Sequence, residues 1–133
     1  MPTTATLPYV VSTRFIDLLR MNAVTGWSTH AIELRGKHDE IIDGYYGLVV
    51  TGRCGPIQNE RARPALVRAP AGHMAKSWFG YYVDEASWDG SEMFAPANTS
   101  FIFVLGRVKR LLEAAKLTNI TLTPVTEIER IML

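Results

Sequence analysis

Two stretches of the chain place hydrophobic residues at a helical period between shorter apolar runs. In residues 101–127, the apolar run Phe101–Leu105 leads into a stripe made by Val104, Val108, Leu111, Leu112 and Ala115. This spacing covers one face of a 3.6-residue helix. Apolar and β-branched residues then alternate over Ile120–Val125, as in a half-buried strand. The stretch predicts a strand, a helix and a strand in succession.

The same pattern occurs near the start of the chain, in residues 9–34. A shift of 93 positions superimposes Val11, Arg14, Phe15, Leu18, Leu19 and Thr25 on Val104, Arg107, Val108, Leu111, Leu112 and Thr118. We therefore expect a structural repeat. Two unrelated strand–helix–strand units that share only the pattern of an amphipathic helix are the alternative.

The remaining segments predict further strands and loops. Residues 1–8 hold two prolines and three threonines and are expected to form a flexible N-terminal tail. Gly44–Thr51 has the strongest β-propensity, and Ser77–Val83 is a second, aromatic strand. Asp84–Thr99 reads as a loop with one helical turn near its start, and Val125–Leu133 as a short helix or a frayed end.

The predicted fold is α+β. We expect a single domain over residues 9–133 in which two repeated strand–helix–strand units lie around a mixed or antiparallel sheet. The strands Gly44–Thr51 and Ser77–Val83 are expected to join the two units.

Composition limits the classes of function. The chain has 133 residues, of which 47% are hydrophobic and 20% are charged, as in ordinary folded domains. The formal net charge of +1 gives no overall field that would attract nucleic acid. No apolar run approaches the ~18 residues of a membrane helix, and the N-terminus lacks the pattern of a secretory signal. We expect a cytoplasmic protein that contacts neither membrane nor nucleic acid directly.

The sequence contains no convincing catalytic or metal-binding set. Cys54 follows Arg53, and an adjacent cation lowers a thiol pKa, but no base is placed beside it by sequence. The three histidines, His30, His38 and His73, lack the spacing of a zinc site. Phosphate-binding glycine motifs are missing as well. We predict no catalytic residue, no metal and no cofactor.

Charged residues are segregated into two segments. A basic segment contains Arg53, Arg61, Arg63, Arg68 and Lys76. Between Ser77 and Gly106 there is no Lys or Arg, and the charged residues all lie in the stretch Asp84–Glu92, here called the acidic loop. Two solvated loops would explain both segments. Alternatively, the acidic loop is a contact surface with a tryptophan anchor, so that the partner-binding residues would be Asp84, Glu85, Trp88, Asp89 and Glu92. Against this, Trp88 could plug the core beneath the loop.

Several short motifs, in order along residues 9–129, resemble an immunity-protein family of bacterial polymorphic toxin systems, formerly a domain of unknown function. They also resemble its relatives with a double Cys-x-x-Cys-Gly motif. The motifs are Val10-Val11-Ser12-x-Arg14, Tyr45-Tyr46-Gly47, Thr51-Gly52-Arg53-Cys54-Gly55-Pro56, Ser87-Trp88-Asp89-Gly90-Ser91 with Phe94, and Arg107-Val108 through Leu117-Thr118-Asn119 to Pro124 and Glu127.

The resemblance implies a non-catalytic protein that binds and neutralises a cognate toxin protein in the producing cell. It does not imply the class of toxin. The chain lacks Cys-x-x-Cys, so a metal role of the double-cysteine relatives does not carry over, and it is shorter at its N-terminus than the family pattern. Two alternatives stay open. A pocket of converging polar groups between the repeat units would favour a small enzyme or ligand-binding domain, and a large exposed apolar face would favour a homodimeric interaction module.

Overall fold

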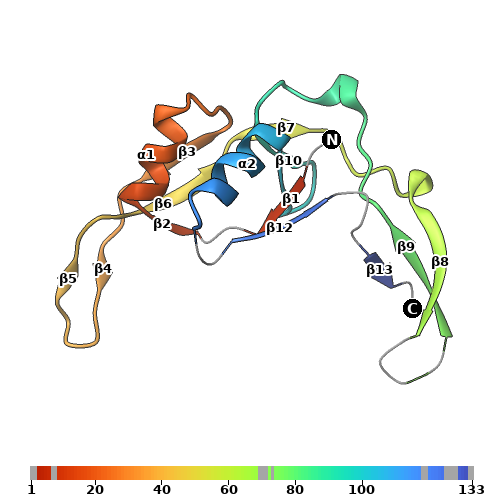
Figure 1. Ribbon diagram of the computed structural model, residues 1–133, viewed down its shortest axis with the longest axis horizontal. Helices are drawn as coiled ribbons and strands as arrows, with labels where there is room; N and C mark the ends of the chain where they lie inside the picture. The colour runs from red at the N-terminus through yellow and green to blue at the C-terminus, as the bar shows by residue number, and fades with distance from the viewer. Residues whose placement is uncertain are drawn as a thin grey trace.

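The computed structural model describes residues 3–6, 9–68, 72, 74–117, 120–124 and 129–131. The architecture is α+β, as expected, and the chain is elongated (Figure 1). The two α-helices lie in its middle part, a β-hairpin projects at one end, and a small sheet lies at the other. The helices are α1 (Thr13–Met21) and α2 (Gly106–Ala114), with short 3-10 turns η1 (Asn59–Arg61) and η2 (Glu85–Ser87).

The described strands form four sheets. Their bounds are β1 (Thr3–Thr6), β2 (Val10–Ser12), β3 (Trp27–His30), β4 (Leu34–Arg35), β5 (Ile41–Ile42), β6 (Tyr45–Val50), β7 (Gly52–Cys54), β8 (Arg63–Arg68), β9 (Met74–Phe79), β10 (Met93–Pro96), β11 (Ile102–Val104), β12 (Thr121–Pro124) and β13 (Glu129–Ile131). The strand orders are β12-β1-β11-β10-β7, β13-β9-β8, β2-β6-β3 and β4-β5. The five-stranded sheet is mixed because β10 and β7 run parallel.

The repeat predicted from the sequence is present in the structure. The units are β2-α1-β3 and β11-α2-β12, and a shift of 93 positions carries the bounds of α1 onto those of α2. Each unit encloses a third strand that is antiparallel to both of its own. This central strand is β6 in the first unit and β1 in the second.

The two units also share a strand register. Across the first sheet, Gly47 lies between Val10 and His30. Across the second, Thr4 lies between Phe103 and Thr123, which are the residues 93 positions after Val10 and His30. A match that extends to the pairing partners on both sides of the central strand favours a duplicated architecture over two unrelated amphipathic helices.

The two units are interlocked. In chain order β1 comes first, yet it pairs inside the second unit, while β6 follows the first unit and pairs inside it. A duplicated module of one strand followed by strand–helix–strand, in which each copy lends its first strand to the other, accounts for this order. Residues 52–100, here called the insertion, separate β6 from the rest of its module and have no counterpart between β1 and β2.

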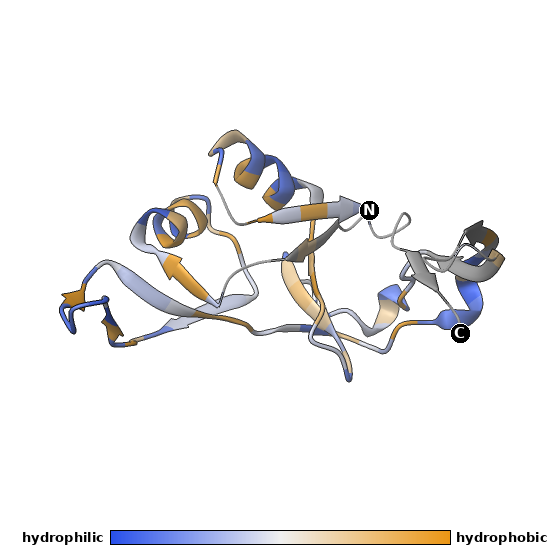
Figure 2. Cartoon of the chain, turned by 90° about the horizontal axis from the view of Figure 1, so that it is seen from below, coloured by the Kyte–Doolittle hydropathy of each residue, from blue (hydrophilic) through white to orange (hydrophobic). Residues whose placement is uncertain are grey.

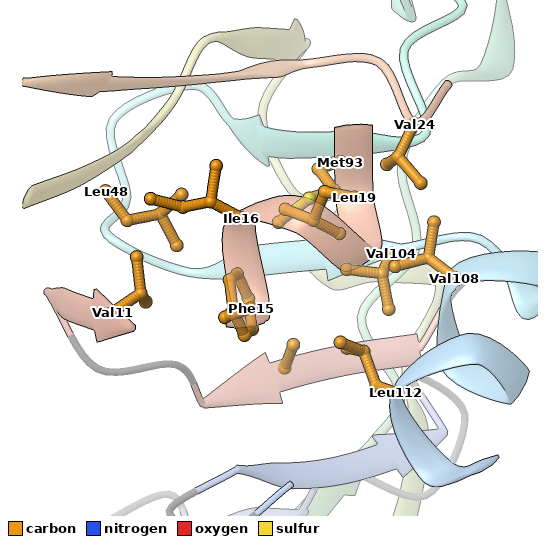
Figure 3. Close-up of a cluster of buried hydrophobic side chains, with 11 residues drawn as sticks. Val11, Phe15, Ile16, Leu19, Val24, Leu48, Met93, Val104, Val108 and Leu112 are labelled. Atoms are coloured by element: carbon orange, nitrogen blue, oxygen red, sulfur yellow. The ribbon is translucent and has the colours of Figure 1, made fainter. Parts of the chain in front are cut away.

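A core shared by both units holds them together (Figure 3). Equivalent positions contribute equivalent side chains: Val11 and Val104 from the strands, Leu19 and Leu112 from the helices. Leu48 and Ala5, from the two central strands, are also buried there. Each fully buried large aliphatic side chain contributes about 1.5–3 kcal/mol, so the predicted helix stripes supply much of the packing. Both helices lie on the same side of the strands (Figure 2).

A second, aromatic core lies over the opposite face of β11. Phe103 is fully buried there with Cys54, Tyr81 and Phe94 of the insertion. Trp88 of the insertion and Leu105, which follows β11, pack against this cluster. The ring of Phe94 meets that of Phe103 edge to face with centroids 5.8 Å apart, and Tyr81 stacks on Phe103 at 6.3 Å. Such geometries are favoured by the quadrupoles of the rings.

Local contacts fix the start of α1 and connect the two helices. The side chain of Ser12 accepts a hydrogen bond from the backbone N–H of Phe15 (3.3 Å), which satisfies one of the orphan donors of the first turn. Arg14 donates from Nη2 to the carbonyl oxygen of Ala115 at 2.6 Å. A cation at the C-terminus of α2 also complements the helix dipole.

Four of the sequence-based expectations for the fold are wrong. Asp84–Thr99 is not a loop throughout, because Met93–Pro96 form strand β10. Residues 3–6 are not a flexible tail, because β1 pairs on both sides and Ala5 is buried. The strand expected at Ser77–Val83 begins at Met74, ends at Phe79 and lies in the sheet with β8 and β13, so it does not join the repeat units. Within Val125–Leu133, the described residues 129–131 form strand β13 and no helix.

Candidate functional site

The acidic loop follows β9 and is held by its own polar groups. Asp84 precedes η2, and its Oδ1 accepts from the backbone N–H of Ala86 at 3.0 Å. The hydroxyl of Ser87 accepts from the N–H of Gly55 at 2.8 Å, which ties this turn to the end of β7. Asp84 and Glu85 are exposed, and no contact of the Glu85 side chain is found among the described residues. Their two charges face solvent.

The other two acids of the loop serve the fold. The Oδ2 of Asp89 accepts from the backbone N–H of Arg53 at 2.9 Å, and its Oδ1 accepts from that of Ser91 at 2.9 Å. The Ser91 bond is the main reason that the pKa of Asp89 lies below its usual range. Asp89 is exposed, and its lowered pKa keeps it ionised. Its hydrogen bond to Arg53 also holds the loop against β7.

Glu92 makes a bidentate ion pair with Arg107 at the start of α2. The two hydrogen bonds, from Nη2 and Nε of Arg107, measure 2.6 and 2.7 Å. They hold the pKa of Glu92 below its ordinary value. The Glu92 side chain is only 17% exposed, so its charge is neutralised within the protein and adds little to the field of the loop.

Trp88 is not the exposed anchor that the charge pattern suggested. Its indole is half-buried and packs against the aromatic core, with its ring centroid 5.5 Å from that of Phe94. The Nε1–H donates to the carbonyl oxygen of Ser91 at 2.9 Å. The competing interpretation, in which the tryptophan plugs the core beneath the loop, is the one that the structure supports. Of the five predicted contact residues, Asp84 and Glu85 thus have the side chains most open to a partner.

Cys54 is buried in the aromatic core. Burial raises the pKa of its thiol, and the nearby charge of Asp89 raises it further. Both effects disfavour the nucleophilic thiolate. His38 lies in the turn of the β4–β5 hairpin, His30 lies on β3, and His73 is outside the described residues. Within the described ranges, no three of the His, Cys, Asp and Glu residues come together as a metal site.

A shallow groove of about 540 Å³ is lined by residues of β2, β3 and β6 and by residues 95–102, which lead from β10 to β11. Its apolar side chains are well exposed: Tyr9 is 79% exposed, Val49 42%, Val10 39% and Phe101 38%. Within the groove, the side chain of His30 lies directly against the backbone of Gly47. A Cβ added at Gly47 would lie only 2.1 Å from Nε2 of His30. The imidazole therefore rests on this glycine, and a larger residue would displace it.

The groove has an uneven charge. None of its lining residues is acidic, and its ionisable basic side chains are Arg53 and His30. Arg53 is held in place because its Nη1 donates to the carbonyl oxygens of Val50 (2.7 Å) and Gly52 (2.9 Å). No partner is found for its Nε and Nη2 among the described residues. The groove presents apolar side chains beside a positioned cation.

The basic segment does not form one continuous site in the described residues. Arg53 lines the groove, whereas Arg61 lies over the ring of Tyr82 at 5.1 Å and donates to the carbonyl oxygen of Val83. Such a stacked arginine contributes to packing as well as to charge. The side chains of Arg68 and Lys76 are outside the described residues.

The groove was not predicted from the sequence, although β6 carried a signal for it. Apolar residues in β6 occupy both faces of the strand, with Tyr46, Leu48 and Val50 on one side and Tyr45 and Val49 on the other. A strand with one solvated face alternates between apolar and polar residues. The missing alternation indicates that the outer face is covered or contacts something.

No protein-family model matches the chain, and no curated protein matches it. Neither α-helix in the described ranges is long and apolar enough to cross a membrane.

Proposed function

We propose that this chain is a non-catalytic immunity protein, which binds and neutralises a cognate toxin domain in the cytoplasm of the cell that makes both. The observation that carries the proposal is the role of the residues behind the resemblance. Ser12 caps α1, Asp89 pins the acidic loop to β7, and Arg107 pairs with Glu92. These motifs specify a scaffold.

Such a division of labour suits a protein whose function is recognition. A family of binding proteins shares the contacts that build its fold and can vary the surface that selects a partner. Cys54, the residue closest to a catalytic candidate, is packed in a core where its pKa is raised. This supports a role in binding more than one in covalent catalysis.

The acidic loop is proposed to guide the encounter with the toxin. Many toxin domains act on nucleic acid and carry basic clefts, and an acidic surface speeds association with such a cleft. The exposed charges of Asp84 and Glu85 can act in this way, and Asp89 adds a third.

The test is a binding titration with the toxin domain encoded beside this chain, with growth protection as a second readout. Asp84→Asn with Glu85→Gln removes two charges and keeps an acceptor at the cap of η2. We expect a lower association rate and a weaker salt dependence. Asp43→Asn with Glu113→Gln is the matched control, since it removes two exposed charges elsewhere.

Two outcomes would count against these proposals. An association rate equal to that of the control would exclude the acidic loop from the encounter. A wild-type protein that neither binds the adjacent toxin domain nor protects cells would refute the immunity function itself.

A further inference from the structure

The internal repeat shows how the outer face of one unit is covered. Phe103 of β11 is fully buried, because Phe94 and Tyr81 of the insertion pack over it. The equivalent residue of β2 is Val10, which lies in the same register row of its own sheet and is 39% exposed. The insertion packs over one of the two equivalent faces, whereas beside the other it only lines a groove, through Arg53 and residues 95–100, and Val10 stays exposed.

We propose that the groove over β2 and β6 is the docking site for an apolar segment of the toxin domain. This segment places an aromatic side chain over Val10 and a carboxylate against Arg53. The inference rests on the immunity function proposed above, and it adds where the partner is held and by which chemistry.

The aromatic side chain proposed for the toxin segment is inferred from the way the equivalent face of the second unit is covered. In the second unit, the register partner of Phe103 on β10 is Phe94, whose ring meets it edge to face, and Tyr81 stacks on Phe103. The open face offers similar surroundings: the side chains of Tyr9, Val10 and Val49, with Phe101 at the edge. Phe101 already stacks on Tyr81 at a centroid distance of 5.0 Å, so a ring in the groove would extend an existing aromatic cluster.

The carboxylate proposed for the toxin segment is inferred from the positive charge in the groove. Arg53 is positioned by two backbone carbonyls. Among the described residues, its Nε and Nη2 have no acceptor and no acid lines the groove to neutralise it. A planar guanidinium held in this way suits a bidentate carboxylate. A Lys or Arg in the docked segment would be repelled by the same group.

The groove and the acidic loop meet at Arg53, whose backbone N–H donates to Asp89. One partner can therefore contact both. Their kinetic signatures differ, because exposed charges at the edge of an interface change the association rate, whereas a desolvated anchor changes the dissociation rate. The two roles can be measured separately on the same toxin domain.

The experiment measures the dissociation of the adjacent toxin domain from the full chain carrying Tyr9→Asp. Tyr9 is 79% exposed, so we expect the substitution to leave the fold intact while it places an acid in the groove and removes apolar surface. The matched control is Leu66→Asp, because Leu66 is 67% exposed and lies in the distant sheet of β8. We expect the dissociation rate to rise at least about tenfold for Tyr9→Asp and to stay within about twofold for the control.

Four further variants sharpen the result. Val49→Asp should act like Tyr9→Asp if it folds, and Val49→Thr, which keeps the shape and adds no charge, should weaken binding less. Arg53→Gln should raise the dissociation rate by about tenfold, whereas Arg53→Lys should retain part of the affinity, since a lysine keeps the charge but not the planar pair of donors.

The outcomes are distinguishable. Dissociation unchanged in Tyr9→Asp and Val49→Asp, with wild-type binding intact, overturns the docking site and leaves the immunity function standing. Absence of wild-type binding overturns both. Sedimentation of the chain alone provides the last arm: a wild-type dimer that becomes a monomer in Tyr9→Asp would show that a second copy occupies the groove, and would overturn the proposal.

Discussion

The two repeat units have the same strand register, but their outer faces, which point away from the shared core, differ: one is buried and the other is exposed. Over β11 the insertion adds a strand and a layer of aromatic side chains, so that Phe103 becomes a core residue. Over β2 no such layer is found in the described residues, and Val10 stays at the surface beside a groove. The exposure of a side chain at a given sheet position therefore depends on what the rest of the chain places over it, and not on the strand alone.

The largest expected effect separates the two faces directly. Phe103→Ala should lower the free energy of unfolding by about 3–5 kcal/mol, because it opens a cavity among packed rings. Val10→Ala, at the equivalent position, should cost less than about 1 kcal/mol, since the side chain is partly solvated. Urea denaturation of both variants measures the contrast. Similar losses in the two variants would mean that the faces are equally covered.

On the faces of the two units that point into the shared core, equivalent substitutions should destabilise the protein by similar amounts, in contrast to those on the outer faces. Leu19 and Leu112 occupy equivalent positions on α1 and α2 and are 0% and 2% exposed. Leu19→Ala and Leu112→Ala should each cost about 2–5 kcal/mol as cavity mutations in the shared core. The same denaturation experiment checks this. A loss below about half a kcal/mol in either variant would contradict the proposed common core.

The helix starts provide a smaller difference between the units. Ser12 caps α1 with its side chain, whereas Leu105 holds the same place before α2 and makes no side-chain cap. Ser12→Ala should therefore destabilise the protein by about 1 kcal/mol. Thermal unfolding gives the measurement, with Ser12→Asn as a control that retains an acceptor and should stay close to wild type.

The smallest effect is a difference in pH dependence between equivalent arginines. Arg107 bonds the carboxylate of Glu92, and Arg14 bonds a backbone carbonyl that does not titrate. Because the pKa of Glu92 is lowered in the folded state, its pair stabilises the fold above the unfolded pKa of ~4.3 and loses this contribution as pH falls through the folded pKa. Arg107→Gln should be destabilising at neutral pH and progressively less so in acid.

Arg14→Gln is the matched control, and its destabilisation should be independent of pH over the same range. Chemical denaturation at several pH values between neutral and acidic checks both variants. An Arg107→Gln effect that persists unchanged in acid would show that packing, and not the ion pair, carries the contribution of this side chain.

The sequence was sufficient to predict the α+β class, the helix stripes and the repeat, because local periodicity encodes them. It did not predict that β1 pairs inside the second unit, since the partners of Thr3 include Val104 and Pro124, at the other end of the chain. A run of polar threonines with prolines nearby has the composition of a tail, and only tertiary pairing makes it a strand.

The candidate site was predicted in part. Charge segregation identified the acidic loop, yet Asp89 and Glu92 have structural partners that composition could not reveal, such as the backbone of Arg53. The Asp-Gly-Ser order did contain a clue, because an aspartate often accepts from the backbone N–H two residues on. The groove combines distant segments, from Tyr9 to Ile102, and so lay beyond local pattern reasoning.

The interlocked strands have a consequence for how the chain is made. β1 is synthesised before the other strands of both units, whereas its two neighbours, β11 and β12, follow only after residues 7–101. At ~5–20 residues per second, the first strand waits for several seconds before its sheet can close. Such distant pairing also slows folding. A nascent copy of this protein therefore cannot complete its second sheet until β12 has been made, and any partner that needs that sheet must wait until then.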